Sequence, residues 1–355
     1  MTTPLSTAAI EAGFAASPRF FPHSLDIANR RVLMLDLTVE TFLGESFLDD
    51  RLFQSGPPGG WLPEEEFVRL AARLPAPARS VGYVFHVGHC GSTLLSRLLA
   101  AKGDAFPLRE PVPLRVLADA RVEADQPWDP LGEARYSRLL DAFTRSWARR
   151  PAGAHLSLVK ATSLASGLAP DLMEVTPHAR ALALRIPLPV YLAALLSPGE
   201  PSADLMRGAR VRLSRLSNLV GDPGLRLHAL TPGELAAVSW LAEAATLSRL
   251  AATLPDRVIA LDFEDFLAAP ADTLSRVAGH FGLPWQQADA GAAIASPIMQ
   301  RYSKSPDQAY TPGDRAAVQA ESAARNAGEI DRGRALVDTL VGRFDALEGV
   351  ADWTG

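Results

Sequence analysis

Residues 88–93 place two glycines, two hydroxyl side chains, a histidine and the only cysteine of the chain in one short segment, Gly88-His89-Cys90-Gly91-Ser92-Thr93. An apolar run precedes this segment and leucines at helical spacing follow it, so it joins a strand to the start of a helix. Unpaired N–H groups at a helix N-terminus bind phosphate or sulfate oxygens, and glycines let the backbone approach the anion. The pattern predicts an anion-binding loop, although a plain glycine turn with a Ser/Thr cap fits the same residues.

The loop differs from the ATP- and GTP-binding motif, in which a lysine precedes the Ser/Thr position. No lysine precedes Ser92 or Thr93, which disfavours an ordinary ATPase or GTPase. Cys90 permits two interpretations. A thiol at a helix N-terminus can have a lowered pKa and be reactive, whereas the interpretation that we favour uses only the backbone amide of Cys90.

Strands that alternate with helices position this loop. Four short runs rich in β-forming residues read as buried strands: 81–87, 155–161, 180–185 and 257–263. Helical spacing follows over 92–103, 189–196, 231–254 and 272–281. Such alternation predicts an α/β fold with a P-loop-type parallel β-sheet flanked by helices, in three layers. The loops after Val87, Lys160, Arg185 and Asp262 should then meet at the carboxyl edge of the sheet, where ligands bind.

The two ends of the chain carry weaker patterns. Residues 1–78 read as an irregular, partly helical N-terminal extension with one helix at 64–74, and residues 79–355 as the α/β domain. From about Ser296 we expect a loop and then a helix over 334–347. Acceptor-binding residues are expected in the N-terminal extension and in loops within 115–136.

Composition excludes some classes of protein. The net charge is -5, which disfavours sequence-independent binding of DNA or RNA. A single cysteine excludes an internal disulfide and fits a reducing compartment. The first residues lack the pattern of a signal peptide, and no uncharged apolar run is long enough to span a membrane. These features predict a cytoplasmic protein without membrane insertion.

Two segments carry a resemblance to a known family. Residues 85–99, FHVGHCGSTLLSRLL, resemble the 5′-phosphosulfate-binding loop of sulfotransferases, and residues 258–284 resemble the structural segment that ends in Phe-Gly-Leu-Pro. The resemblance covers roughly residues 80–312, and later motifs are nearest to those of tyrosylprotein sulfotransferases. It implies a sulfotransferase-like three-layer sandwich and the donor 3′-phosphoadenosine 5′-phosphosulfate (PAPS).

The resemblance also implies catalytic roles for three residues. Glu110 follows the loop at the distance where the family places the carboxylate that takes the proton of the acceptor hydroxyl. Lys160 corresponds to a lysine that neutralises charge on the leaving group. His89 stands where the family has Lys or Arg, and it carries a full charge only when protonated. Arg109 is an alternative to Glu110, as a residue that orients an acidic substrate.

The other residues expected to bind PAPS match the family motifs less closely. Arg185 resembles the arginine that binds the 3′-phosphate, but Ile186 and Ala193 occupy the polar positions of that motif. Ser305 resembles a nucleotide contact in a C-terminal loop, with Ser303 and Lys304 as adjacent candidates. Four arginines in residues 206–215 are either substitute phosphate ligands or a solvated helix face. They are Arg207, Arg210, Arg212 and Arg215.

The sequence therefore predicts a sulfotransferase that moves a sulfuryl group from PAPS to a hydroxyl or amine, without a metal ion. The acceptor is a small molecule, a glycan or a peptide, and homo-oligomerisation stays open. The alternative is a catalytically weak or inactive nucleotide-binding protein on the same fold. Phosphoryl transfer from ATP is a third, weaker option that would require magnesium.

Overall fold

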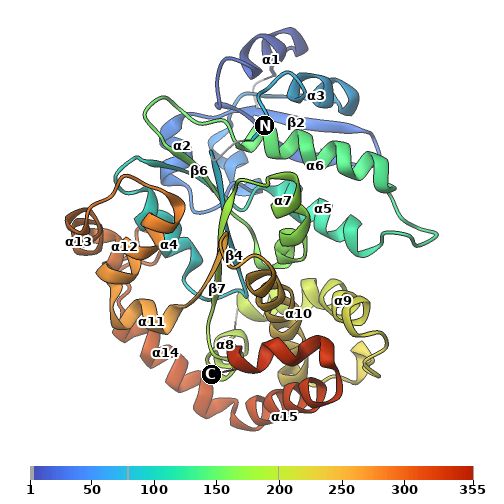
Figure 1. The fold of residues 1–355 in the computed structure, drawn as a ribbon, viewed down its shortest axis with the longest axis vertical. Helices are drawn as coiled ribbons and strands as arrows, with labels where there is room; N and C mark the ends of the chain where they lie inside the picture. Colours follow the sequence, from blue (N-terminus) through green and yellow to red (C-terminus); the bar gives the residue numbers. More distant parts are fainter. Residues whose placement is uncertain (1–3, 78–79, 199, 355) are drawn as a thin grey trace.

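A five-stranded parallel sheet forms the centre of the molecule (Figure 1). The computed structural model describes residues 4–77, 80–198 and 200–354. The strand order is β5-β6-β4-β7-β8, and every neighbouring pair is parallel. The bounds of the strands are β4 (Val81–His86), β5 (Ala105–Arg109), β6 (Leu156–Lys160), β7 (Arg180–Arg185) and β8 (Val258–Asp262). The four predicted strands are confirmed to within about two residues at each end.

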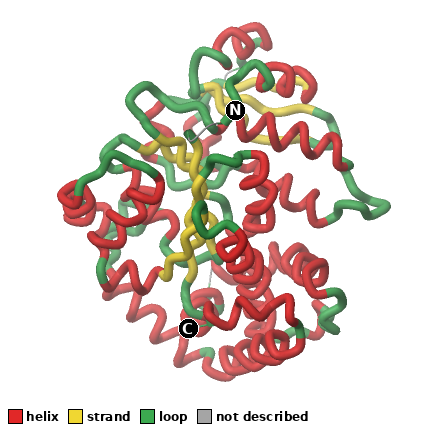
Figure 2. The backbone as a smooth tube through the Cα atoms, in the orientation of Figure 1, coloured by secondary structure: helices red, strands yellow, loops and turns green. Residues whose placement is uncertain are grey.

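Helices cover both faces of this sheet, which makes three layers (Figures 1 and 2). One face carries α4 (Ser92–Ala100), α11 (Phe263–Ala268), α12 (Pro270–Phe281) and α13 (Gln287–Ala295). The other carries α5 (Val112–Val122), α7 (Ala169–Val175), α10 (Pro232–Thr253) and the short 3-10 helix η2 (Ser163–Leu168). Around α10 pack α8 (Leu188–Leu195), α9 (Glu200–Val220) and α15 (Ala327–Arg343). The predicted α/β class is thereby confirmed.

The carboxyl ends of the strands lie side by side, as predicted. Lys160 at the end of β6 is in register with Val84 of β4 and with Arg109 of β5. Arg185 at the end of β7 pairs in register with Asp262 of β8. The chain leaves β4 toward one face of the sheet and β6 toward the other, and such a reversal opens a crevice at the carboxyl edge.

Strand β5 was not predicted, because Pro107 stands in its middle. A proline removes a hydrogen-bond donor and is normally confined to edge strands. β5 lies at one edge of the sheet, next to β6, and this position tolerates Pro107. It matters for the site, because β5 delivers Glu110 beside Lys160.

The N-terminal residues form more regular structure than predicted. A three-stranded antiparallel sheet consists of β1 (Phe20–Asp26), β2 (Arg31–Asp36) and β3 (Gly59–Pro63). Around it lie α1 (Thr7–Phe14), α2 (Val39–Gly44), the 3-10 helix η1 (Asp50–Ser55) and the predicted helix α3 (Glu64–Ala71). The pairing of β1 with β2 shifts register between Pro22 and Ser24, so alternation is interrupted in the sequence. The division of the chain at residue 78 stays a prediction.

Two further expectations are wrong. The C-terminal loop after Ser296 contains an additional helix, α14 (Pro312–Arg325), before α15 and the final 3-10 helix η5 (Asp345–Trp353). Residues 115–136, expected as loops, include most of α5 and the start of α6 (Glu133–Trp147). Two short 3-10 helices complete the elements, η3 (Leu227–Ala229) and η4 (Pro297–Gln300).

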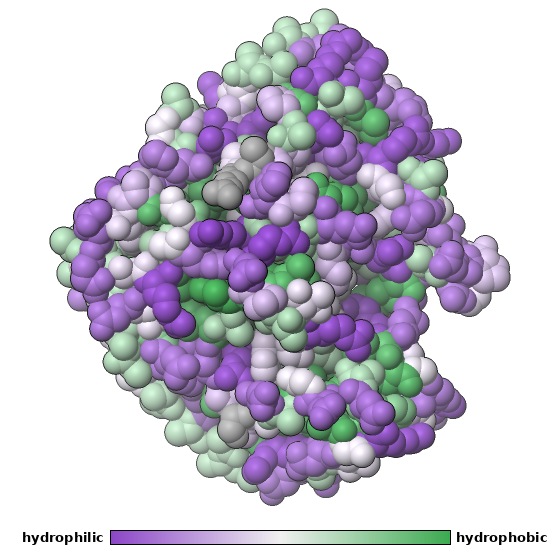
Figure 3. Space-filling model, in the orientation of Figure 1, coloured by the Kyte–Doolittle hydropathy of each residue, from purple (hydrophilic) through white to green (hydrophobic). Residues whose placement is uncertain are grey.

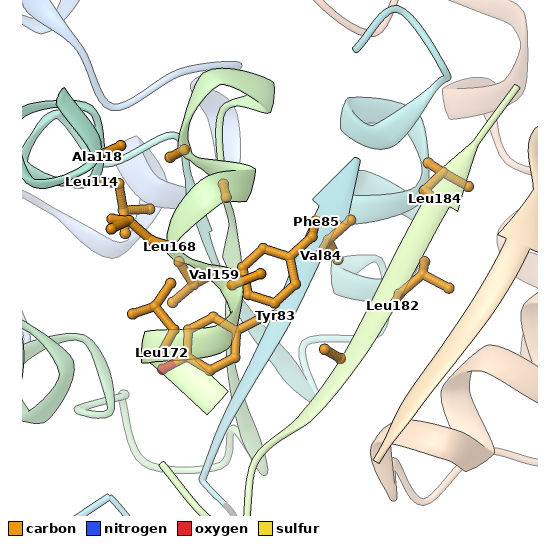
Figure 4. Close-up of a cluster of buried hydrophobic side chains, with 14 of the residues drawn as sticks. Tyr83, Val84, Phe85, Leu114, Ala118, Val159, Leu168, Leu172, Leu182 and Leu184 are labelled. Atoms are coloured by element: carbon orange, nitrogen blue, oxygen red, sulfur yellow. The ribbon is translucent and has the colours of Figure 1, made fainter. Parts of the chain in front are cut away.

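Apolar side chains from the sheet and its helices form one continuous core. In Figure 4, Tyr83 and Phe85 of β4 face Leu168 and Leu172 on the η2–α7 side of the sheet. Hydrophilic residues cover most of the face in Figure 3, with apolar residues in small groups. Among the described residues, no helix is both long and apolar enough to cross a bilayer.

Candidate active site

The loop between β4 and α4 has an unusual backbone. Gly88, His89 and Gly91 have φ angles of 97°, 51° and 72°, in the left-handed region that favours glycine. Gly91 is restricted further, since a Cβ atom there would lie 2.1 Å from a ring carbon of Phe263. Turns of this kind point successive N–H groups into one concave surface, which binds anions. The backbone thus supports the predicted anion loop.

The first turn of α4 offers polar groups that lack protein partners. Ser92 and Thr93 begin this helix and are both buried. Among the described residues, the buried Thr93 Oγ1 has no hydrogen-bond partner. An unsatisfied buried hydroxyl costs about 1–3 kcal/mol, and first-turn N–H groups have no acceptor within the helix. A phosphate or sulfate oxygen at this position would satisfy both.

Cys90 is fully buried, and its Sγ lies 3.8 Å from the carbonyl oxygen of Leu184. Burial raises the pKa of the Cys90 thiol to about 12. A protonated and inaccessible thiol is a poor nucleophile. The side chain therefore serves packing, which agrees with the interpretation that only the amide of Cys90 is useful.

Glu110 and Lys160 form an ion pair at the carboxyl edge. Lys160 Nζ donates a hydrogen bond to Glu110 Oε1, and the N–H of Glu110 donates to the carbonyl oxygen of Lys160 at 2.7 Å. The Lys160 side chain is 1% exposed and that of Glu110 is 19% exposed. Burial lowers the pKa of Lys160 although Glu110 acts in the opposite direction. Glu110 has a φ of 57°, a strained value for this residue type that turns the chain out of β5.

The N-terminal segment closes the side of the site next to this pair. The ring centroid of Phe47 lies 5.7 Å from Lys160 Nζ, and Leu48 N–H donates to the carbonyl oxygen of Arg109 at 2.7 Å. Arg109 itself is 1% exposed and donates to Ser96 Oγ and to backbone carbonyls of residues 42–45. Arg109 thus anchors the N-terminal segment, and the alternative that it orients a substrate is wrong.

A pocket of about 250 Å³ lies over the anion loop and the Glu110–Lys160 pair. It is lined by the loop, α11, α14 and residues 301–311, which we call the strap. Among the described residues of its lining, the charged side chains are four cations and one carboxylate: Lys160, Arg301, Lys304, Arg315 and Glu110. This excess of positive charge in a chain of net charge -5 favours an anionic ligand.

The strap is attached to the loop helix. Arg97 of α4 donates to the carbonyl oxygen of Ser303 at 2.9 Å and to Ser46 Oγ at 2.8 Å. Within the strap, the rings of Tyr302 and Tyr310 pack edge to face with centroids 5.2 Å apart. Arg97 therefore fixes the strap over the pocket and links it to the N-terminal segment.

His89 lines the pocket as a neutral side chain in the free protein. Burial, together with the positive charges of Lys304, Arg212 and Lys160, lowers its pKa to about 3, and Asp204 acts in the opposite direction. A bound anion would add negative charge beside the ring and raise this pKa. The ring is thus placed to gain a proton as an anion binds.

Two residues predicted to bind PAPS, Arg185 and Ser305, lie outside the lining of this pocket. Arg185 Nη1 donates to the carbonyl oxygen of Asp352, its Nε lies 3.6 Å from Asp262 Oδ2, and its guanidinium packs over Trp353. Ser305 occupies a turn of the strap, where its N–H donates to the carbonyl oxygen of Tyr302 at 2.9 Å. The adjacent candidates Ser303 and Lys304 line the pocket instead. Ile186 and Ala193, the departures from the family motif, are buried.

The arginines of α9 divide into two groups. Arg212 and Arg215 are buried and bind the carboxylate of Glu243, which is fully buried, at 3.3 and 2.9 Å. Arg212 Nη2 also donates to Ser163 Oγ at 3.2 Å. Arg207 and Arg210 lie on the exposed face of α9. The helix therefore combines a structural ion cluster with a solvated face.

The sequence interpretation missed three basic residues among the described lining of the pocket, His86, Arg301 and Arg315. His86, the last residue of β4, is a buried polar residue in an otherwise apolar strand, and that contrast was a usable signal. Arg301 and Arg315 lie in a segment read as a loop. Thr311 and Asp314 form a capping box at the start of α14, so a helix signal was present there. Glu264 at the start of α11 pairs with Arg315 at 2.5 Å, and the side chain of Asp262 caps α11.

Among the described residues, no group of three or more His, Cys, Asp or Glu side chains is arranged to hold a metal ion.

Comparisons with known proteins identify the family of the chain. Residues 84–287 match the model of the sulfotransferase family, which is more than half of the chain. The chain therefore belongs to the sulfotransferase family. The comparison with curated proteins found no match.

Three solved structures are similar at low identity. The sulfotransferase domain from the curacin biosynthetic pathway is 14% identical with a TM-score of 0.37, over 70% of this chain and 97% of that chain. Sulfotransferase STF9 from Mycobacterium avium is 15% identical with a TM-score of 0.39, over 72% and 78%. A sulfotransferase from Alicyclobacillus acidocaldarius is 16% identical with a TM-score of 0.35, over 72% and 96%.

Proposed function

We propose that this protein transfers the sulfuryl group of PAPS to a hydroxyl or amine acceptor. The observation that carries the proposal is the Glu110–Lys160 pair at the floor of a basic pocket, directly beside the anion loop. A carboxylate and a buried ammonium group in contact supply the base and the cation that this transfer requires. We place the protein in the cytoplasm, as its single cysteine fits a reducing compartment.

The loop would bind the phosphosulfate end of the donor. Backbone amides from Cys90 to Thr93 would hold the 5′-phosphate together with the Thr93 hydroxyl, which has no hydrogen-bond partner in the described part of the chain. His89 and Lys160, which both line the pocket, would stabilise negative charge on the sulfuryl and leaving groups. Two observations support this fit: the buried Thr93 hydroxyl lacks a partner among the described residues, and the φ angles of Gly88, His89 and Gly91 are those of an anion-binding turn.

The transfer would proceed in line. The acceptor oxygen forms a bond to sulfur while the bond between sulfur and the bridging phosphate oxygen breaks. Glu110 receives the acceptor proton, and Lys160 donates a hydrogen bond to the oxygen of the departing bisphosphate. A carboxylate has two oxygens, so Glu110 can keep one hydrogen bond to Lys160 and turn the other oxygen toward the acceptor.

The 3′-phosphate contact is proposed for Arg185. Its guanidinium has five N–H donors, and its present contacts with Asp352 and Asp262 leave donors free. Ser305 is proposed as a further nucleotide contact through the strap. The acceptor is a small molecule, a glycan or a peptide.

A second candidate function is binding of the nucleotide with weak or no transfer. It is favoured by Ile186 and Ala193, which place buried apolar side chains at two positions where the family motif is polar. Both an active enzyme and this second candidate would bind the nucleotide, so affinity for PAPS does not separate them. The rate of sulfuryl transfer does.

Calorimetric titration with 3′-phosphoadenosine 5′-phosphate (PAP), with ATP as the control nucleotide, tests the donor. We expect PAP to bind and ATP to bind more weakly. Transfer of sulfuryl from labelled PAPS is then screened against alcohols, phenols, glycans and peptides, with Glu110→Gln as the negative control. Binding of PAP without transfer to any acceptor class would favour the second candidate, and absence of PAP binding would refute the proposed donor.

A further inference from the structure

His86 makes two hydrogen bonds that link the two halves of the candidate site. Its ring is 4% exposed and lies at the end of β4. His86 Nε2 lies 2.8 Å from the carbonyl oxygen of Ala161, and the N–H of Gly88 donates to His86 Nδ1 at 3.0 Å. Both nitrogens of the ring are thus engaged with backbone groups.

These partners define the protonation state of the ring. Nδ1 accepts from an N–H group and carries no proton, whereas Nε2 faces a carbonyl oxygen and must donate. The ring is therefore neutral, with its proton on Nε2. Burial holds the pKa of His86 well below its ordinary value, and the positive charges of Lys160 and Lys304 act in the same direction.

The two bonds connect segments that carry different site residues. Ala161 directly follows Lys160, and Gly88 directly precedes His89. Ser166 Oγ of η2 also donates to the carbonyl oxygen of His86 at 3.0 Å, which fixes its backbone. The His86 ring consequently bridges the end of β6 and the anion loop through two hydrogen bonds.

The loop needs such support. Gly88 and His89 both have positive φ angles, and His89 is strained there because it has a Cβ atom. The Gly88 N–H is the donor that keeps the first residue of the loop in this conformation. We propose that His86 is a positioning residue that, as the neutral ring with its proton on Nε2, orders the anion loop and sets its position relative to Lys160. Only the identity of the anion rests on the proposed function.

Three substitutions separate the two hydrogen bonds. The bond from Gly88 reaches back two residues, as in an Asx turn, so His86→Asn retains an acceptor for it. His86→Gln has a longer side chain, whose amide group can still donate toward the Ala161 carbonyl but is poorly placed for Gly88. His86→Ala removes both bonds.

A matched control exists in the same sheet. His280 Nε2 lies 3.0 Å from the carbonyl oxygen of Ala181, which is near the amino end of β7 and remote from the pocket. His280→Ala thus removes a comparable bond between a histidine and a strand. Thermal unfolding of all four variants shows whether each retains the fold.

Hydrogen exchange, measured without any ligand, tests whether the hydrogen bonds of His86 order the anion loop. Peptides that cover residues 84–94 should exchange about tenfold faster in His86→Ala and His86→Gln than in the wild type, which is the effect of one hydrogen bond. His86→Asn should remain close to the wild type, and His280→Ala should not change these peptides. Wild-type exchange in a folded His86→Ala or His86→Gln, or equally fast exchange in His86→Asn, would overturn the proposal.

Titration with PAP separates this proposal from the proposed function. If PAP binds the wild type, its affinity should fall about tenfold in His86→Ala and recover in His86→Asn. If PAP does not bind, the donor assignment fails, while the exchange data still decide the role of His86.

Discussion

The Lys160 ammonium group donates a hydrogen bond to the Glu110 carboxylate, and the two residues lie at the ends of adjacent strands, β6 and β5. The pair is held by the backbone as well, through the bond from Glu110 N–H to the Lys160 carbonyl. Its geometry is thus set by the sheet and does not depend on loop conformation. A rigid base beside a buried cation is a suitable arrangement for transfer to a hydroxyl group.

Glu110→Gln should abolish most of the transfer activity. The amide keeps an oxygen to accept from Lys160 but cannot take a proton from the acceptor, so we expect kcat to fall by about 10²–10⁴-fold. PAP binding should remain, because the anion loop is unchanged. The measurement is transfer of label from PAPS with calorimetry on the same variant. Turnover like that of the wild type would exclude Glu110 as the base.

Arg185→Ala should reduce the preference for a 3′-phosphate. The preference is measured as the ratio of the Kd values for AMP and PAP, which differ by that phosphate. Loss of a charged hydrogen bond of about 1.5–3 kcal/mol should lower this ratio by about tenfold or more. Arg315→Ala is the matched control from the pocket lining, and we expect it to weaken both ligands alike. If only Arg315→Ala loses the preference for a 3′-phosphate, then Arg315 and not Arg185 binds that phosphate.

PAP binding should be accompanied by proton uptake at His89. The pKa of His89 is about 3 in the free protein, and an adjacent anion raises it. Because the bound state holds the extra proton, affinity should increase as pH falls from 7.5 to 6. Calorimetry in buffers of different ionisation enthalpy measures the uptake, and His89→Asn should remove it. Proton release, or the same uptake in His89→Asn, would contradict this prediction.

The same histidine should make the free protein less stable in acid. In the unfolded chain His89 titrates near its ordinary pKa of about 6.5, so between that value and about 3 the unfolded state binds more protons. The free energy of unfolding therefore falls as pH falls through this range. Urea unfolding at pH 7 and pH 5 should show a smaller difference for His89→Asn than for the wild type. An equal difference would mean that other groups dominate the acid response.

Replacement of Glu243 should destabilise the fold without a direct contact to the pocket. Glu243→Gln removes the carboxylate that pairs with both Arg212 and Arg215, and among the described residues only Arg212 keeps another carboxylate, that of Asp204 at 3.4 Å. Leaving the buried Arg215 without a countercharge costs about 3–5 kcal/mol. Arg210→Ala is a control from the same helix, where the exposed ion pair with Glu123 should contribute less than about 1 kcal/mol. Urea unfolding compares the two, and similar small losses in both would refute the structural role of the cluster.

The parts of the fold and site that could be predicted from the sequence are those with strong local signals. The glycines of the loop and the leucines after it specify a strand, a turn and a helix, and four strands followed from their apolar runs. Pro107 concealed β5, because local rules cannot show that a strand lies at the edge of its sheet. Arg185 illustrates the limit for the site, since its contact with Asp352 joins residues far apart in the chain. No local pattern reports such a contact.

Removal of the Thr93 hydroxyl should stabilise the free protein and weaken donor binding. Thr93 Oγ1 has no hydrogen-bond partner among the described residues, so an isosteric methyl group in Thr93→Val should relieve a cost of about 1–3 kcal/mol. The same variant should bind PAP more weakly, because the anion loses one donor. Thr93→Ser, which keeps the hydroxyl, is the control and should retain the affinity. The midpoint of thermal unfolding and the Kd for PAP are the measurements. A Thr93→Val variant that is less stable than the wild type would mean that the hydroxyl already has a partner, such as an ordered water, and unchanged affinity would exclude Thr93 from the anion site.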